Sequence, residues 1–483
     1  RGGKGAQQRM RDKWMPVLVG DSKYGKRTVI GTEEILKNFT HETIRNFYKT
    51  WYRPDLQAIA AVGDFDIDQV EKTIKERFGA IPAAVKPKPF GKFPIADFKG
   101  TRVAIVTDPE QPYMIAQVMT KLPKAEEKTL NDSRESIKRS LFNQMLQARL
   151  QELTQQASPP FLFGGASYSG FIGDYDAFFN IAVAKDGNLE GALKAVLNEG
   201  IRAKNFGFTA SELERTKKQL LTGVERRFKE KDKTKSANYV SEYMNHFLEG
   251  SPATGIEFYY EFVKEQLDGI KIEEINALSA KYLTPDNRTV IVMASEKDKD
   301  KLPTEAKVLE WINSAGQGVT AYEDKVINKH LVENLPKAGS TVSTKQIAEI
   351  GATELTLSNG VKVVLKPTEF KNDEILIGAK SQGGTSLYSD KDFMSADISN
   401  VVVEVSGVGE FNQNALKKFL TGKVARISPY VGEYEEGFSG SSSPKDLETA
   451  LQLIYAYFTK PRKEDDVIKG FMATERSAIQ NMT

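Results

Sequence analysis

Three histidines, His41, His246 and His330, are the only imidazole side chains in this sequence of 483 residues, and they lie on separate segments. A zinc site needs about three or four converging nitrogen, oxygen or sulfur ligands, and its strongest sequence signals place two histidines on one helical turn. Neither HExxH nor HxxEH occurs here. We interpret His41 as a helix-start or surface residue, His246 as a core or interface residue and His330 as a surface residue. We therefore expect this chain to bind no metal.

Other residue types that occur in catalytic sites also lack the spacing that chemistry requires. The absence of cysteine excludes disulfides, thiolate metal sites and a cysteine nucleophile. The serine run Ser439–Ser443 has no neighbouring histidine that would activate a nucleophile. Gly164-Gly165 and Gly383-Gly384 match neither G-x-G-x-x-G nor the Walker pattern, so we interpret them as tight turns between strands rather than as phosphate sites. The residues alone show no complete active site.

The composition is that of a globular protein with several domains. A total of 67 Lys and Arg against 65 Asp and Glu gives a formal net charge of +2, and 40% of the residues are hydrophobic. So small a charge gives no extended basic field, and we expect no nucleic acid partner. The apolar runs are far shorter than the roughly 18–20 residues of a membrane span, so we expect none. At roughly 100–200 residues per domain, the length predicts two to four domains.

The elements that would position a site are organised as repeats. A helix that ends in an aromatic residue, a Pro-Asp turn and an apolar strand are predicted over Glu42–Asp66 and again over Glu273–Asp298. The proline ends each helix because it lacks an amide hydrogen and displaces the preceding residue from helical geometry. A second repeated pair, a strand followed by a helix, predicts helices at Leu189 and Leu447, which are 258 residues apart. Together the pairs predict three copies of one module, of which the middle copy is whole.

Each module is expected to have an α+β fold, with a mixed, mostly antiparallel sheet covered by helices on one face. The predicted divisions are residues 1–96 (the back half of a first, catalytic-type domain), 97–300 (a complete second domain), 301–350 (a linker) and 351–483 (the front part of a third domain). Because two copies are incomplete, the chain is expected to be an interior piece of a longer protein. The alternating charges of Arg226–Lys235 are typical of a solvated helix face.

Several segments, taken together, resemble the pitrilysin-type zinc peptidases, the family of insulin-degrading enzyme and the mitochondrial processing peptidase. Lys23–Arg27, Trp51–Asp55 and Val62–Asp64 are similar to the back half of the family's catalytic domain. Glu354–Lys366 is similar to the strand pair that opens its domains, and Phe163–Leu193 is similar to its second-domain pattern. The resemblance covers nearly the whole chain, and it rests on the order of these segments rather than on any single motif.

The resemblance implies an inverted zincin, in which HxxEH supplies two zinc ligands and a glutamate base. That motif would precede Arg1, and the matching stretch of the third domain, Ser395–Val401, contains neither His nor Glu. We therefore assign no catalytic or metal-binding residue, and expect zinc only in the parent protein. The family also implies that a Gly-Gly segment of the second domain pairs with the N-terminal end of a peptide, which places substrate binding at Gly164, Gly165 and Ala166.

The sequence thus predicts an interior fragment of a zinc-dependent metalloendopeptidase that hydrolyses peptides, with the fragment itself inactive. Its expected partners are peptide substrates, with neither nucleic acid nor a membrane span. The alternative is a non-catalytic pitrilysin-like subunit that only binds a protein partner. An HxxEH motif in the parent protein upstream of Arg1 would discriminate between the two.

Overall fold

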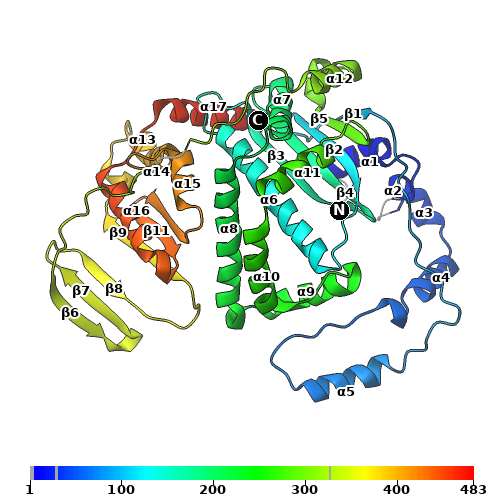
Figure 1. The fold of residues 1–483 in the computed structure, drawn as a ribbon, viewed down its shortest axis with the longest axis horizontal. Helices are drawn as coiled ribbons and strands as arrows, with labels where there is room; N and C mark the ends of the chain where they lie inside the picture. The colour runs from blue at the N-terminus through cyan, green and yellow to red at the C-terminus, as the bar shows by residue number, and fades with distance from the viewer. Residues whose placement is uncertain (1–4, 28–30, 326–327, 483) are drawn as a thin grey trace.

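The computed structural model describes residues 5–27, 31–325 and 328–482, and it has the α+β architecture that the sequence predicts (Figure 1). Its centre is a five-stranded sheet in the order β1-β5-β2-β4-β3. The strands β1 and β5 pair in parallel, and the other neighbours pair antiparallel. The strands are β1 (Thr101–Asp108), β2 (Ile115–Pro123), β3 (Phe161–Ile172), β4 (Tyr175–Ala184) and β5 (Arg288–Ser295).

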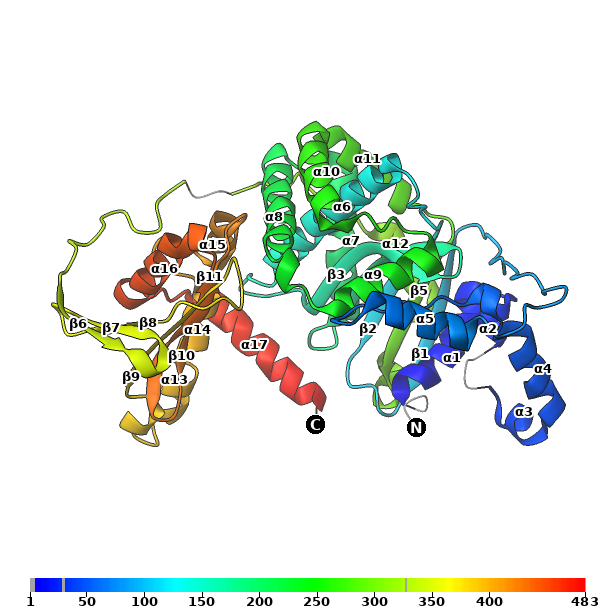
Figure 2. The ribbon, with the colours of Figure 1, turned by 90° about the horizontal axis from the view of Figure 1, so that it is seen from below.

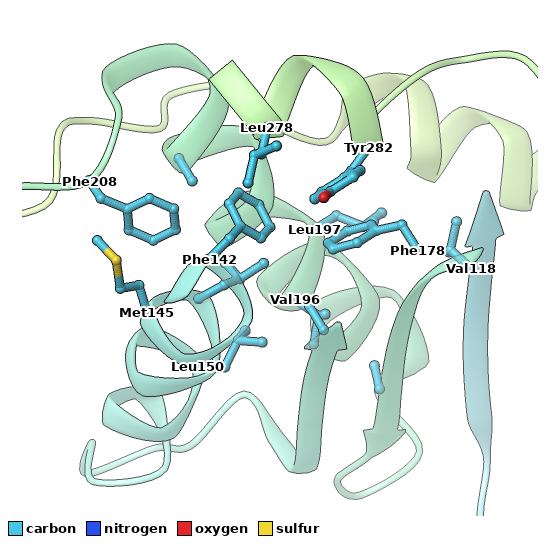
Figure 3. Packing of buried hydrophobic residues seen from close by; sticks show 14 of the residues in the cluster. Val118, Phe142, Met145, Leu150, Phe178, Val196, Leu197, Phe208, Leu278 and Tyr282 are labelled. Atoms are coloured by element: carbon cyan, nitrogen blue, oxygen red, sulfur yellow. The ribbon is translucent and has the colours of Figure 1, made fainter. Parts of the chain in front are cut away.

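Long helices cover one face of this sheet, and the rings of Phe142, Phe178 and Tyr282 pack together beneath them (Figure 3). The centroid of the Phe142 ring lies 6.1 Å from that of Phe178 and 5.3 Å from that of Tyr282, in edge-to-face geometry. The Phe178 and Tyr282 rings are stacked, with centroids 5.6 Å apart. Phe142 belongs to a helix of 24 residues, which begins with a capping box between Thr129 and Asp132. The helices are α6 (Leu130–Leu153), α7 (Leu189–Phe206), α8 (Ala210–Lys229), α9 (Ser236–Glu249), α10 (Gly255–Gly269) and α11 (Ile272–Tyr282).

The opposite face of the sheet is covered by helix α1 (Ala6–Val19), which is followed by α2 (Lys23–Lys26). The α1 side chains of Met15 and Leu18 pack against Met119 and Ile291 of the strands. Successive strand residues point to opposite faces, which is why Val118 joins the helical core and Met119 joins this second cluster.

Residues 31–94 lie outside this body. Helices α3 (Glu33–Asn38), α4 (His41–Trp51) and α5 (Ile67–Phe78) extend away from the sheet, on the side far from the C-terminal part (Figures 1 and 2). The predicted helix and Pro-Asp turn form, but the predicted strand after Leu56 does not, so this expectation was wrong. Gln57 has an extended backbone, but a strand forms only when a neighbouring strand bonds to it. The equivalent strand β5 pairs with β1 and β2, whereas the segment after Leu56 has no partner strand among the described residues.

The C-terminal part, called here the third unit, contains two three-stranded sheets. Its α16 begins at Leu447 and α7 begins at Leu189, which confirms the predicted repeat of strand and helix. The strands are β6 (Thr341–Ile347), β7 (Ala352–Leu357), β8 (Lys362–Leu365), β9 (Ile375–Gln382), β10 (Ala425–Val431) and β11 (Glu435–Ser442). The helices are α13 (Phe393–Asp397), α14 (Ser399–Ser406), α15 (Gln413–Leu420), α16 (Leu447–Thr459) and α17 (Asp465–Met482).

The connection between the central domain and the third unit includes helix α12 (Glu305–Ser314), which packs Val308 and Trp311 into the central core. The strand β6 also precedes residue 351 and pairs with β7, so the stretch 301–350 contains ordered structure at both ends. Among the described residues, no helix has the length and hydropathy that crossing a membrane requires.

The charged run Arg226–Lys235 lies at the contact between α8 and the third unit, rather than on a fully solvated face. Arg226 forms an ion pair with Glu374 at 2.8 Å. The carboxylate of Glu230 accepts the backbone N–H of Asp373 at 2.7 Å. The alternating signs by themselves indicate a solvated helix face, because sequence spacing does not show which partners come from elsewhere in the chain.

Candidate functional site

The strand β3 lies at the edge of the central sheet and contains all three residues that were predicted to contact a peptide. Gly165 pairs with Ile181 of β4, and Ala166 pairs with Asn180. Gly164 and Gly165 are therefore inside a continuous ladder, and their interpretation as a tight turn was wrong. An edge strand presents unpaired backbone groups along its free side, which is the geometry that strand addition uses.

Two amide side chains of α6 contact this free side. Gln147 donates to the Gly164 carbonyl oxygen at 3.5 Å and accepts the Ala166 N–H at 3.4 Å. Asn143, one helical turn earlier, donates to the Tyr168 carbonyl oxygen at 2.9 Å and accepts the Tyr168 N–H at 2.8 Å. Alternate residues of an antiparallel strand bond to the neighbouring strand, so these contacts place the backbone groups of residues 164, 166 and 168 at the free edge.

The edge is held unevenly along its length. The two bonds of Asn143 have ordinary hydrogen-bond lengths, whereas those of Gln147 are at the limit of hydrogen-bond distance. Tyr168 is fixed further because its hydroxyl donates to Asp176 at 2.5 Å. Burial, together with that hydrogen bond, raises the pKa of Tyr168, which keeps the phenol neutral. The stretch at residues 164–166 is therefore the part of the edge that a competing strand could occupy with least loss.

The two glycines have different packing environments. A Cβ on Gly164 would lie 2.6 Å from the ring of Phe161, whose side chain is fully buried. A Cβ on Gly165 would lie 3.4 Å from Ile181 and from Phe163, which is an ordinary to tight contact. Gly164 therefore has a packing reason to lack a side chain, independent of any peptide.

A cleft of about 690 Å³ opens beside the strand, a size typical of ligand sites. Its walls come from α6, α8 and β3 of the central domain and from α15 of the third unit. Ala166 and Ser167 line it from β3, so the predicted site and the cleft are adjacent. Six side-chain amides contribute to the polar lining: Asn143, Gln144, Gln147, Gln151, Gln219 and Asn414.

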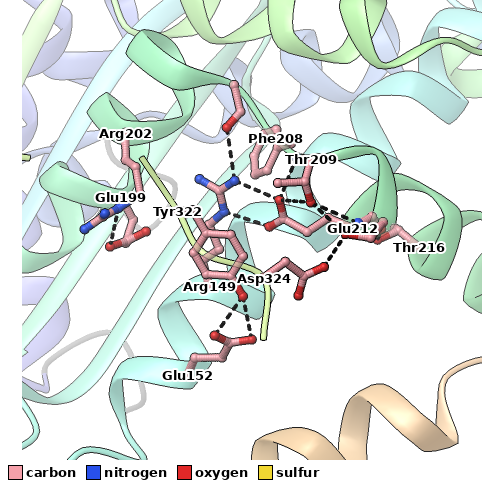
Figure 4. A network of polar contacts seen from close by, with 12 residues as sticks. Arg149, Glu152, Glu199, Arg202, Phe208, Thr209, Glu212, Thr216, Tyr322 and Asp324 are labelled. Carbon is pink, nitrogen blue, oxygen red and sulfur yellow. Dashed lines mark hydrogen bonds and ion pairs between the residues drawn. The ribbon is translucent and has the colours of Figure 1, made fainter. Parts of the chain in front are cut away.

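A buried ion pair joins two of the helices that form the cleft (Figure 4). The Arg149 guanidinium donates to Glu212 through Nε at 2.7 Å and through Nη2 at 2.8 Å. Glu212 also accepts the backbone N–H of Thr209 at 2.8 Å, within the capping box that begins α8. The ring of Tyr322 lies 4.3 Å from the guanidinium carbon. The pair thus fixes α6 against the first turn of α8.

Tyr322, which bonds to Glu152 in Figure 4, and Asp324 lie in the connection after α12. Both also contact Lys418 of the third unit. The Lys418 ammonium of α15 lies 2.8 Å from Glu152 and 3.1 Å from Asp324, and it donates to the Tyr322 hydroxyl at 3.1 Å. Burial alone would raise the pKa of Asp324, but the Arg215 ion pair and further hydrogen bonds outweigh it and lower the value to about 2. The cleft walls are therefore held together by ionised groups.

The histidines do not converge on any site. His41 is the exposed first residue of α4, as expected, and His330 is exposed. His246 is also exposed, so a core role for it was wrong: its Nδ1 lies 2.7 Å from the Ser251 carbonyl oxygen, just past the end of α9. Across the part of the chain that the structure describes, no group of three or more His, Cys, Asp or Glu side chains could hold a metal ion.

The sequence interpretation missed the side chains that control the edge. Asn143 and Gln147 are four residues apart on one helix, so they share a face, and this spacing was a readable signal. Tyr322, Asp324 and Lys418 meet across long stretches of sequence, and no local pattern marks them.

The sequence and the fold are similar to those of known zinc proteases. Residues 38–220 match the family model described as the peptidase M16 inactive domain. The "Zinc protease PQQL-like" of Arabidopsis thaliana is 27% identical over 98% of this chain and 45% of its own length. The "Probable zinc protease PqqL" of Escherichia coli K12 is 24% identical over 97% of this chain and 50% of its own length.

The chain is a pitrilysin-family (M16) homologue of PqqL-like zinc proteases over nearly its whole length. It spans about half the length of these relatives. The crystal structure of the periplasmic protease PqqL from Escherichia coli has the same fold, with a TM-score of 0.61 and 22% identity, over 99% of this chain and 53% of that one. The family and the fold implied by the sequence resemblance are thus confirmed.

Proposed function

We propose that this chain is part of a zinc-dependent metalloendopeptidase that hydrolyses peptides, and that its central domain binds the substrate as a strand added to β3. Homology to zinc proteases supports the peptidase class. The observation that carries the binding role is the edge at Gly164–Ala166, which is buried and where, among the described residues, only Gln147 contacts the outward backbone groups, at the limit of hydrogen-bond distance.

An arriving peptide would displace the Gln147 amide and take over its bonds. The Ala166 N–H would donate to a peptide carbonyl, and the Gly164 carbonyl oxygen would accept a peptide N–H. Gly165 lies between them, with its backbone bonded to β4. Since such a ladder uses groups that every residue has, it would select extended peptides rather than one sequence.

The zinc-dependent step is assigned to the parent protein and not to residues of this chain. The three histidines lie on separate segments, and no HxxEH occurs. A zinc centre does not fit these residues, so we derive no chemical step from them and predict that the isolated chain is inactive. In the parent, residues 1–96 would complete a first, catalytic-type domain, 97–300 would form the second, 301–350 would link it onward, and 351–483 would begin the third.

A non-catalytic subunit that binds a protein partner is the second candidate. The match to the M16 inactive domain over residues 38–220 favours it, because that description names a domain without catalytic activity. Zinc analysis and peptide hydrolysis by the complete parent protein discriminate between the candidates: metal-free, inactive protein would favour the subunit.

Binding at β3 is tested with the 483-residue chain and a fluorescein-labelled extended peptide, by fluorescence anisotropy. Ala166→Pro removes the outward N–H, whereas the ladder to β4 uses residues 165 and 167. Proline is tolerated where an edge-strand N–H faces outward. Loss of one hydrogen bond should weaken binding about fivefold.

The control for this experiment is a peptide of the same sequence that is N-methylated at alternate residues, which removes its ladder donors. It should lose binding to the unsubstituted chain. The circular dichroism spectrum of the Ala166→Pro variant should match that of the unsubstituted 483-residue chain. Such a match excludes unfolding as the cause of weaker peptide binding. Equal affinity for methylated and unmodified peptides would refute strand addition.

A further inference from the structure

The charged side chains that line the cleft do not neutralise one another. Five are basic and two are acidic. Three of the basic groups have carboxylate partners: Arg149 with Glu212 at 2.7 Å, Arg215 with Asp324 at 2.8 Å, and Lys418 with Glu152 at 2.8 Å. Both acidic groups of the lining are used in these pairs.

Lys417 and Lys423 remain, and in the described part of the chain neither has a carboxylate partner within ion-pair distance. Lys423 donates a long hydrogen bond of 3.4 Å to the Thr449 hydroxyl. Partial burial lowers the pKa of Lys417, and both lysines are nevertheless exposed residues. An anion that enters the cleft would meet two ammonium groups without carboxylate partners.

These two lysines belong to α15 and to the segment before β10, so they lie on the wall that the third unit contributes to the cleft. On β3, Ala166 belongs to the core on the helical side of the sheet. A strand added to β3 would alternate its side chains in the same way, and those on the helical side would point towards α6 and α8, which also line the cleft. Every second side chain of the peptide would therefore face the cleft that contains the two lysines.

We propose that the cleft binds a peptide carboxylate through Lys417 and Lys423, and that acidic extended peptides are therefore preferred over neutral ones of the same length. This proposal rests on the proposed docking of a peptide strand on β3, and it adds the chemical class of the substrate. The amides that line the cleft would bond the polar backbone and neutral side chains, while the two ammonium groups would supply the charge selection.

The test compares labelled extended peptides binding to the 483-residue chain at low and high salt. One peptide has a central Glu and blocked ends, its twin has Gln in that position, and a third has Gln with a free C-terminal carboxylate. We expect the Glu peptide to bind about tenfold more tightly than the Gln twin, with the ratio falling at high salt because ion pairs are screened. Tighter binding of the third peptide instead would assign the lysines to a C-terminal carboxylate, which supports the same chemistry.

Lys417→Gln and Lys423→Gln should each reduce the preference for the carboxylate, and together they should abolish it without weakening the Gln peptide. Lys391→Gln, an exposed lysine outside the cleft, is the matched control and should change nothing. Equal binding of the Glu and Gln peptides would overturn charge selection and leave strand addition standing. Failure of every peptide to bind would overturn both proposals.

Discussion

Replacing Arg149 by Met should destabilise the central domain more than any surface charge change. Arg149 is 2% exposed, and removal of its guanidinium leaves Glu212, itself 6% exposed, without its ionic partner. Breaking a buried pair in this way costs about 3–5 kcal/mol, because the remaining charge keeps its desolvation penalty. Two bonds to Glu212, one to the Gly207 carbonyl oxygen and a stacked Tyr322 ring are lost together.

Thermal unfolding followed by tryptophan fluorescence measures this loss. The chain has three tryptophans, and replacing Trp14 and Trp51 by Phe leaves Trp311, which is buried in the central core, as the single reporter. At roughly 2–4 °C per kcal/mol for a domain of this size, the midpoint should fall by about 6–20 °C.

Two further variants separate buried charge from lost packing. The double variant Arg149→Met with Glu212→Gln should recover part of the loss, because the amide can still accept the Thr209 N–H. Lys194→Met, which breaks a half-exposed helical pair, is the control and should cost only about 0.5 kcal/mol. If both single variants lower the midpoint equally, the reasoning about buried charge is refuted.

Three other outcomes are expected. The pKa of Asp324 is lowered to about 2, so its carboxylate stabilises the chain above about pH 4, and this stability is lost as the pH falls towards 2. Asp324→Asn should remove this pH dependence, which hydrogen exchange of the surrounding segments measures. Gly164→Ala should lower the unfolding midpoint, since its Cβ meets the Phe161 ring at 2.6 Å and overpacking costs about 1–3 kcal/mol, whereas Gly165→Ala should be tolerated; equal effects would contradict the packing argument. Limited proteolysis should cut first within residues 31–94, which are largely exposed, and should leave the five-stranded sheet intact; early cuts in α6 or α7 would contradict this.

The sequence was sufficient for features that depend on local order. Pro54 and Pro285 end their helices where expected because proline acts on its own neighbourhood. The helices at Leu189 and Leu447 begin where the repeat places them, since amphipathic spacing is also local.

Features that depend on distant partners could not be predicted in the same way. The apolar run after Leu56 has strand composition, yet strand formation is decided by a ladder, and the described chain supplies none there. Gly164 and Gly165 were assigned to a turn because glycine pairs mark turns, whereas here a buried ring explains one of them. The contacts of Gln147 with β3 require knowledge of which helix crosses the edge.

The unpaired run of residues 57–63 also has a consequence for the chain in solution. It contains no charged residue and no proline, and these are the two devices that usually prevent one molecule from pairing with the next. Apart from the Gln57 N–H, which donates to the Pro54 carbonyl oxygen at 3.1 Å, its backbone groups have no hydrogen-bond partner in the described chain, and the stretch between α4 and α5 is mostly exposed. Two molecules that meet there can complete each other's ladder, so the chain should self-associate increasingly with concentration, and a single Lys at Ile59 should suppress this in light scattering.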